Sequence, residues 1–308
     1  MEADAERDRR STGLRVRLPR VSPTAFRGFC AVALGAIVFV TITGATVRLT
    51  GSGLGCDNWP RCGDTFLPPK SFNSLVEFSN RGVGIAVGIA TVIAALAALR
   101  VRNLPRWLLW GTIALPLSVA AQGVLGGITV LTELHPLIVM GHFLLSVAAI
   151  ALAVVVLLGA HWFATERPER VVPRWLEWLA VALVPLLLAL VVSGAFVTAA
   201  GPHSGGEDIP RFGDLETAVY VHVRVTAAFG VGFLVLLAAL WRARDSLRVE
   251  ALFAGGVLAV LIGQMVVGEV QWRNHLVPWW LILIHVTLAT TVFAGMTLLA
   301  SRLVGRAN

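Results

Sequence analysis

The chain has 308 residues, of which 56% are hydrophobic and 14% are charged, and its mean hydropathy of +0.78 excludes a soluble globular domain. The formal net charge of +7 does not indicate nucleic-acid binding, because no basic surface with base-stacking aromatic residues is visible outside the apolar runs. Those runs, at about 20 residues each, predict helices that cross a lipid membrane. We therefore expect an all-α integral membrane protein surrounded by lipid.

Eight apolar runs are long enough to span a bilayer. In chain order they are roughly residues 29–48, 77–99, 106–130, 137–160, 175–199, 217–241, 250–270 and 279–301. If the N-terminus is inside, 18 of the 25 Lys and Arg residues fall in inside segments. Because basic residues accumulate on the cytoplasmic side, we expect cytoplasmic N- and C-termini and a multi-pass protein of a bacterial cell membrane.

The chain also contains an internal repeat. Landmark residues recur at an offset of 142 or 143 positions: Asn80 and His222, His142 and His285, Gln122 and Gln264, Gly126 and Gly268, Pro136 and Pro278. Such a period predicts two tandem four-helix bundles. We divide the chain into a cytoplasmic tail (1–28), a first half (29–160), a cytoplasmic linker (161–174) and a second half (175–302).

Two histidines lie at matching depth in the second half. His222 and His285 are six or seven residues inside their spans, roughly 9–11 Å along each helix at about 1.5 Å per residue. An intramembrane histidine costs free energy unless it is paired or ligated, and this geometry suits two-imidazole ligation of a haem iron. The alternative is that each imidazole bonds a helix carbonyl.

The first half has only one such histidine. His142 lies at the same depth, but its partner by repeat register is Asn80, and asparagine is a poor iron ligand beside imidazole. We expect a haem with one protein ligand there, and an open position that suits a reaction site. The alternative is that His142 is a packed polar residue.

Glu77 lies one helical turn before Asn80, on the same helix face, and its repeat counterpart is Val219. A carboxylate at a membrane-helix entrance is either an interfacial residue or a functional acid. Its neighbourhood with Asn80 favours the functional acid.

The long first outer loop, about residues 49–76, contains Cys56 and Cys62 in GCDNWPRC. The outer side is oxidising, so we expect a disulfide, either a structural staple or a redox-exchanging pair. Cys30 is expected to be a buried small hydrophobe.

Three arginines, Arg48, Arg81 and Arg224, lie at outer helix ends. They could bind haem propionates or simply extend to the interface. We assign no ligand role to the histidines at span ends and in loops, which are His135, His161, His203 and His275. Glu269 precedes Arg273 by four residues, a spacing that favours an ion pair.

Several segments together resemble the heme A synthase family over about residues 30–300. They are GATVRLTGSGLGCDNWPRC (44–62), EFSNR (77–81), GHF (141–143), GPH (201–203) and the two later span histidines. The resemblance implies an eight-helix enzyme that oxidises a methyl group of heme O to the formyl group of heme A, the haem of terminal cytochrome oxidases. It also implies haem b between His222 and His285, heme O in the N-terminal half, and a functional role for Glu77.

The chain departs from the family pattern at two places. Many members have histidine where this chain has Asn80, and some carry a cysteine pair in the third outer loop, which this chain lacks.

We therefore expect a heme A synthase in which the second-half haem relays electrons. The rival is a non-catalytic b-type cytochrome or haem carrier, which would need neither Glu77 nor the asymmetric Asn80 site. A secondary transporter is a weaker alternative, because no pair of broken helices is evident. Expected partners are heme O, heme O synthase, an electron acceptor and, in a homo-oligomer, a second copy.

Overall fold

The computed structural model describes residues 19–56, 58–63, 67–165, 172–203, 205, 209–274 and 278–304. Over these ranges the chain forms eight long helices and no strand. They are α2 (Pro23–Leu49), α3 (Phe72–Ala98), α4 (Arg106–Leu131), α5 (Pro136–Thr165), α6 (Arg174–Ala200), α7 (Leu215–Arg242), α8 (Arg244–Arg273) and α9 (Trp279–Val304). Each is long and apolar enough to cross a membrane, which confirms the predicted fold class.

Local capping groups extend several helices beyond the apolar runs that predict them. The side chain of Ser71 accepts a hydrogen bond from the amide of Ser74, so α3 begins at Phe72 rather than near residue 77. At the other end of the molecule α5 continues to Thr165, into the segment predicted as a linker. The apolar run marks the part of a helix that lies in lipid, whereas the cap marks its end.

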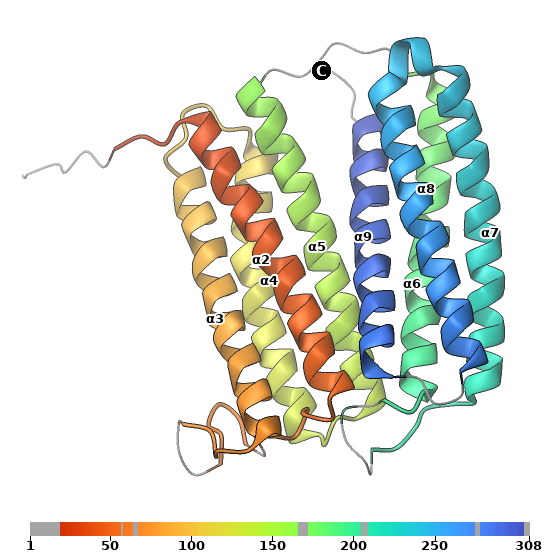
Figure 1. Cartoon of the computed structure of the whole chain (residues 1–308). Helices are drawn as coiled ribbons and strands as arrows, with labels where there is room; N and C mark the ends of the chain where they lie inside the picture. Colours follow the sequence, from red (N-terminus) through yellow and green to blue (C-terminus); the bar gives the residue numbers. More distant parts are fainter. Residues whose placement is uncertain are drawn as a thin grey trace, which may run out of the picture.

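The helices alternate in direction, so the start of α2 and the end of α9, which are the two termini of the described chain, lie at the same end of the molecule (Figure 1). In the first half α2 packs against α3 and α5, and α4 packs against the same two helices. In the second half α6 packs against α7 and α9, and α8 does likewise. The two rings meet through α5 and α9, with α2 against α9 and α5 against α6. This arrangement reproduces the sequence repeat in space.

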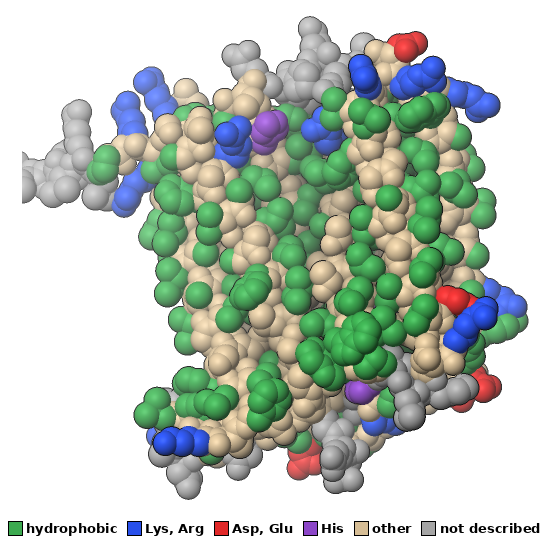
Figure 2. Space-filling view, in the orientation of Figure 1, with side chains coloured by type: hydrophobic (Ala, Val, Ile, Leu, Met, Phe, Trp, Pro, Cys, Tyr) green, Lys and Arg blue, Asp and Glu red, His purple; other side chains and the backbone are tan. Residues whose placement is uncertain are grey.

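The surface is apolar along the middle of the helices and charged toward their ends (Figure 2). Large hydrophobic side chains such as Ile89, Val231 and Leu252 are exposed there, as expected for helices that face lipid. Near the end that holds the termini, Arg302 on α9 forms a 2.7 Å ion pair with the buried Glu250 on α8. The opposite end holds the disulfide loop.

Parts of three predicted features lie outside the described residues. These are residues 1–18 of the tail, residues 166–171 of the linker, and His275.

Candidate functional site

The four repeated positions lie on four helices that all run inward from the end with the disulfide loop. Asn80 is on α3, His142 on α5, His222 on α7 and His285 on α9. Each is about two turns from the start of its helix, and each side chain is partly buried.

In the second half the two histidines lie near one another, within range of electrostatic interaction. Helix α6 contributes Ser193, whose hydroxyl is 2.9 Å from Nδ1 of His222. A Cβ atom added to Gly194 or Gly268 would lie 3.1 Å from Cε1 of His222 or His285, respectively. Glycine at these two positions therefore provides the space that the imidazole rings occupy.

The donor set of the second half fits a haem. Nδ1 of His285 is buried and has no hydrogen-bond partner among the described residues, and Nδ1 of His222 is bound to Ser193. Two imidazoles at similar depth on α7 and α9 would suit the ligation of a low-spin b-type haem. The structure thus brings together the pair that the repeat singles out.

The first half has the same construction around different side chains. Thr43 on α2 donates a 2.7 Å hydrogen bond to Oδ1 of Asn80. A Cβ atom on Gly126 would lie 3.4 Å from Cε1 of His142. Nδ1 of His142 is buried without a partner in the described part of the chain. One imidazole and one amide therefore stand where the second half has two imidazoles.

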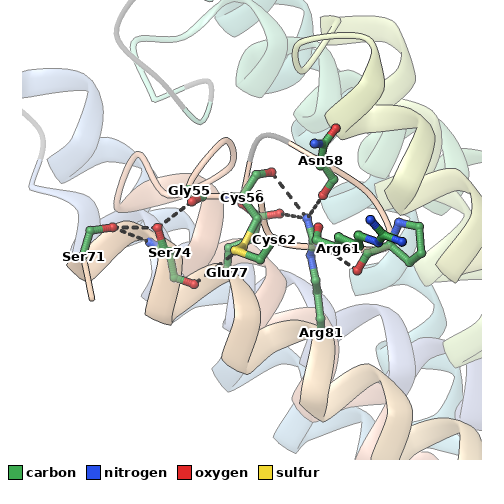
Figure 3. The surroundings of a disulfide bond; sticks show 10 residues. Gly55, Cys56, Asn58, Arg61, Cys62, Ser71, Ser74, Glu77 and Arg81 are labelled. Atoms are coloured by element: carbon green, nitrogen blue, oxygen red, sulfur yellow. Dashed lines mark hydrogen bonds and ion pairs between the residues drawn. A yellow bond between two sulfur atoms is a disulfide. The ribbon is translucent and has the colours of Figure 1, made fainter. Parts of the chain in front are cut away.

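The predicted disulfide loop lies beside α3 (Figure 3). Cys56 and Cys62 form the disulfide, and both are almost fully buried, which favours a structural staple over a redox-exchanging pair. Cys30 is a free, buried thiol as expected. The ring of Trp59 lies so close to Gly127 on α4 that a Cβ atom there would be 2.6 Å from it. The preceding residue, Gly126, faces His142, so the loop and His142 contact adjacent positions of α4.

Glu77 and Arg81 fasten this loop to α3. Glu77 is only 5% exposed, and its Oε2 accepts a 2.8 Å hydrogen bond from the amide of Cys56. Its Oε1 accepts a 2.6 Å hydrogen bond from Nη2 of Arg81. Arg81 also donates to the carbonyls of Arg61, at 2.8 Å, and Asn58, at 3.0 Å. Sequence position alone did not indicate this shared anchoring role.

The other two outer arginines are also engaged by protein groups. Arg48 on α2 donates a 2.5 Å hydrogen bond to the carbonyl of Thr198 on α6, and so links the two halves. The guanidinium of Arg224 lies 3.1 Å from the ring centroid of Tyr220. The expected ion pair of Glu269 with Arg273 forms at 2.6 Å on the surface.

Loops of the two halves are also joined at the end of the molecule that holds the disulfide. The amide of Gly53 donates to the carbonyl of Gly205 at 3.1 Å, and Leu134, in the connection between α4 and α5, packs against both glycines. The loop that contains Gly53 and the loop that contains Gly205 are therefore in contact.

Sequence reasoning missed the hydroxyl residues Thr43 and Ser193. A signal for them exists, because Thr43–Gly44–Ala45 and Ser193–Gly194–Ala195 occupy equivalent places on α2 and α6. The offset between these helices is 150 residues, which differs from the offset of the other landmarks, so a search at one fixed period passes over them.

Comparison with known proteins agrees with this geometry. The model of the family COX15-CtaA, described as cytochrome oxidase assembly protein, matches residues 27–297. A heme A synthase of Symbiobacterium thermophilum is 30% identical over 291 residues, which are 86% of this chain and 91% of the relative. A heme A synthase of Alkalihalophilus pseudofirmus is 28% identical over 247 residues, 75% and 82% of the two chains. A third, of Shouchella clausii, is 25% identical over 286 residues, 86% and 94% of the two chains. Since these matches extend across both four-helix halves, the chain is a multi-pass bacterial membrane protein that belongs to the COX15-CtaA family, the family of the heme A synthases.

Proposed function

We propose that the protein is a heme A synthase, which oxidises a methyl group of heme O to the formyl group of heme A. The observation that carries the proposal is the difference between two otherwise equivalent sites. The second half has two imidazoles, His222 and His285, which suits a closed electron-transfer site. The first half has His142 opposite Asn80 under a capping loop, which suits a site that receives a substrate.

In this proposal His222 and His285 hold haem b, which when bound supplies one-electron transfer. Heme O is the substrate of the first half, with His142 as the protein ligand of its iron. Trp59 and the disulfide loop cover that site and keep bulk water away from the reacting edge.

The reaction requires two successive two-electron oxidations of one methyl carbon. The first replaces a hydrogen by a hydroxyl group, and the second gives a hydrated aldehyde, which loses water to leave the formyl group. Each oxidation releases two electrons and two protons when water supplies the oxygen, so the proposal requires an external electron acceptor. Glu77 is proposed to accept protons or to stabilise developing charge beside the substrate.

The substrate and product are both haems of the membrane. Heme O synthase is therefore proposed to supply the substrate. The protein is also proposed to associate with a second copy of itself in a homo-oligomer. The basic end of the bundle, where both termini lie, is proposed to face the cytoplasm.

Expression of the full chain with and without a heme O supply tests the function. Haem would be extracted from the purified protein and identified by mass. Heme A should form only when heme O is supplied and the chain is present. If the protein binds haem b but leaves heme O unchanged when an oxidised electron acceptor is present, it is a b-type cytochrome or a haem carrier.

A further inference from the structure

Two hydrogen-bonded pairs occupy the same place in the two halves. In the first, Thr43 on α2 is bonded to Asn80 on α3. In the second, Ser193 on α6 is bonded to His222 on α7. Because the two pairs lie at equivalent positions of the repeat, a hydroxyl from one helix meets a central side chain of the next in both halves.

The surroundings of these pairs are equivalent too. Each hydroxyl also reaches the carbonyl three residues earlier in its own helix, Leu190 at 2.9 Å and Val40 at 3.2 Å. Each is followed by a glycine that faces the same partner, Gly194 against His222 and Gly44 against Asn80. The repeat therefore preserves the hydroxyl and the space beside it, and varies only the side chain that it holds.

The hydroxyl proton determines the state of the imidazole in the second half. Ser193 has one hydroxyl proton, and it donates this proton to the carbonyl of Leu190. When the hydroxyl proton goes to Leu190, the 2.9 Å contact with Nδ1 of His222 contains the imidazole proton, and Nδ1–H donates to Oγ of Ser193. A neutral imidazole protonated at Nδ1 has a free lone pair at Nε2, which is the form that ligates a metal.

The same hydroxyl has the opposite role in the first half. Oδ1 of Asn80 has no proton to donate, so Thr43 donates its hydroxyl proton to this atom at 2.7 Å. This hydrogen bond fixes the orientation of the Asn80 amide beside α2. Its nitrogen, Nδ2, lies 3.9 Å from the position of a Cβ atom on Gly44. An amide N–H₂ group donates hydrogen bonds and does not ligate iron.

We propose that Ser193 and Thr43 are positioning residues for the haem groups of the two halves. Ser193 holds His222 as an iron ligand that presents Nε2, whereas Thr43 fixes the orientation of the Asn80 amide in the half that contains His142. The inference rests on the proposed function, because it concerns the haem groups that this function requires.

The second half is tested with full-length protein purified with its low-spin haem. Ser193→Ala removes the acceptor of the Nδ1 proton, which lowers the basicity of the imidazole. We expect a higher midpoint potential and haem transfer to a soluble acceptor that is about 10–100-fold faster. Ser193→Thr should keep the wild-type midpoint potential and rate of haem transfer, because threonine retains the hydroxyl group. The first half already has a threonine, Thr43, at this position. Thr226→Ala is the matched control, since Thr226 donates to the main-chain carbonyl of His222 and not to its ring.

The first half is tested by replacing Asn80 with histidine, the residue that the second half has at the equivalent position. In Asn80→His, Thr43 can donate to the Val40 carbonyl and accept the Nδ1 proton of the new imidazole, as Ser193 does. Added ferric protohaem should then give a second low-spin haem per chain. Adding Thr43→Val should weaken its binding about tenfold, whereas adding Thr46→Val should not, because Thr46 donates only within its own helix.

Three outcomes overturn the inference alone, in protein that retains the wild-type low-spin haem. The first is a midpoint potential and a rate of haem transfer that are unchanged in Ser193→Ala. The second is a Ser193→Thr variant that lacks the wild-type values. The third is a protohaem affinity of Asn80→His that does not change when Thr43→Val is added. Absence of a second low-spin haem in Asn80→His overturns it for the first half, and the second-half haem reports that this variant is folded. Wild-type protein that holds no low-spin haem would instead contradict the proposed function, and this inference with it.

Discussion

Glu77 is held from two sides, by the amide of Cys56 and by the guanidinium of Arg81. Its charge is therefore fixed in place beneath the disulfide loop before any substrate binds. A charge that needs no reorientation during a reaction stabilises developing charge more effectively than a mobile one. The anchoring of the loop and the proposed role in catalysis are thus compatible in the same carboxylate.

The change Glu77→Gln keeps the size of the side chain but removes its charge and its capacity to accept a proton. We expect a folded protein that retains the haem of His222 and His285, and heme A production about 10²–10⁴-fold lower. Mass analysis of extracted haem should show heme O or its partly oxidised product. Glu269→Gln, which removes the exposed ion pair of the same spacing with Arg273, should behave as wild type. Near-normal heme A production by Glu77→Gln would reduce Glu77 to a loop anchor.

Gly268 tests the space around a proposed ligand. In Gly268→Ala the new methyl group would lie 3.1 Å from Cε1 of His285, so the ring or the helix must shift. Overpacking of this kind costs about 1–3 kcal/mol, so we expect about a tenfold or greater loss of low-spin haem affinity. Gly263→Ala on the same helix meets no atom within 4 Å and should retain the haem. Equal haem affinity in both variants would show that His285 does not need this space.

At the scale of elements, α4 connects the cap to the site beneath it. One of its adjacent glycines, Gly126, faces His142, and the other, Gly127, lies under Trp59. Because the disulfide and the Glu77–Arg81 pair hold the loop at α3, the Trp59 contact is the point at which the loop reaches across to α4.

Displacing Trp59 should therefore affect the first half selectively. In Gly127→Ala the methyl group would lie 2.6 Å from the indole ring, and the loop must move away from α4. We expect several-fold less heme A per mole of protein, with the second-half low-spin spectrum unchanged. Gly123→Ala, one turn earlier with no atom within 4 Å, is the matched control. A loss of the low-spin spectrum in Gly127→Ala would contradict a cap that serves one half only.

Hydrophobic length and repeat register predicted the eight spans and the depth of Asn80, His142, His222 and His285, and the presence of two cysteines in one short loop predicted the disulfide. These features depend on local composition or on spacing along one chain. The contacts of Arg81 and Thr43 were not predictable in this way. They depend on which loop folds over α3 and which helix lies beside it, and many placements satisfy the same pattern of apolar residues.

At the scale of the whole molecule, the disulfide loop marks one face of the membrane and both termini mark the other (Figure 1). If that loop is outside, where the environment is oxidising, Cys56 and Cys62 should be linked in native membranes. Alkylation of denatured protein without reductant should then label Cys30 alone, and alkylation after reduction should label three cysteines. Labelling of all three cysteines without reductant would contradict the assigned orientation.

The central claim is that the two equivalent halves have different functions, with electron transfer in the second half and oxidation of heme O in the first. The most direct measurement is the low-spin haem spectrum together with heme A content, in wild type and in three single variants. We predict that His222→Ala and His285→Ala each abolish or convert the low-spin spectrum, because one imidazole cannot complete the axial pair. His142→Ala should retain the spectrum and make no heme A. A low-spin spectrum that survives in both second-half variants, or that is lost in His142→Ala, would contradict the account.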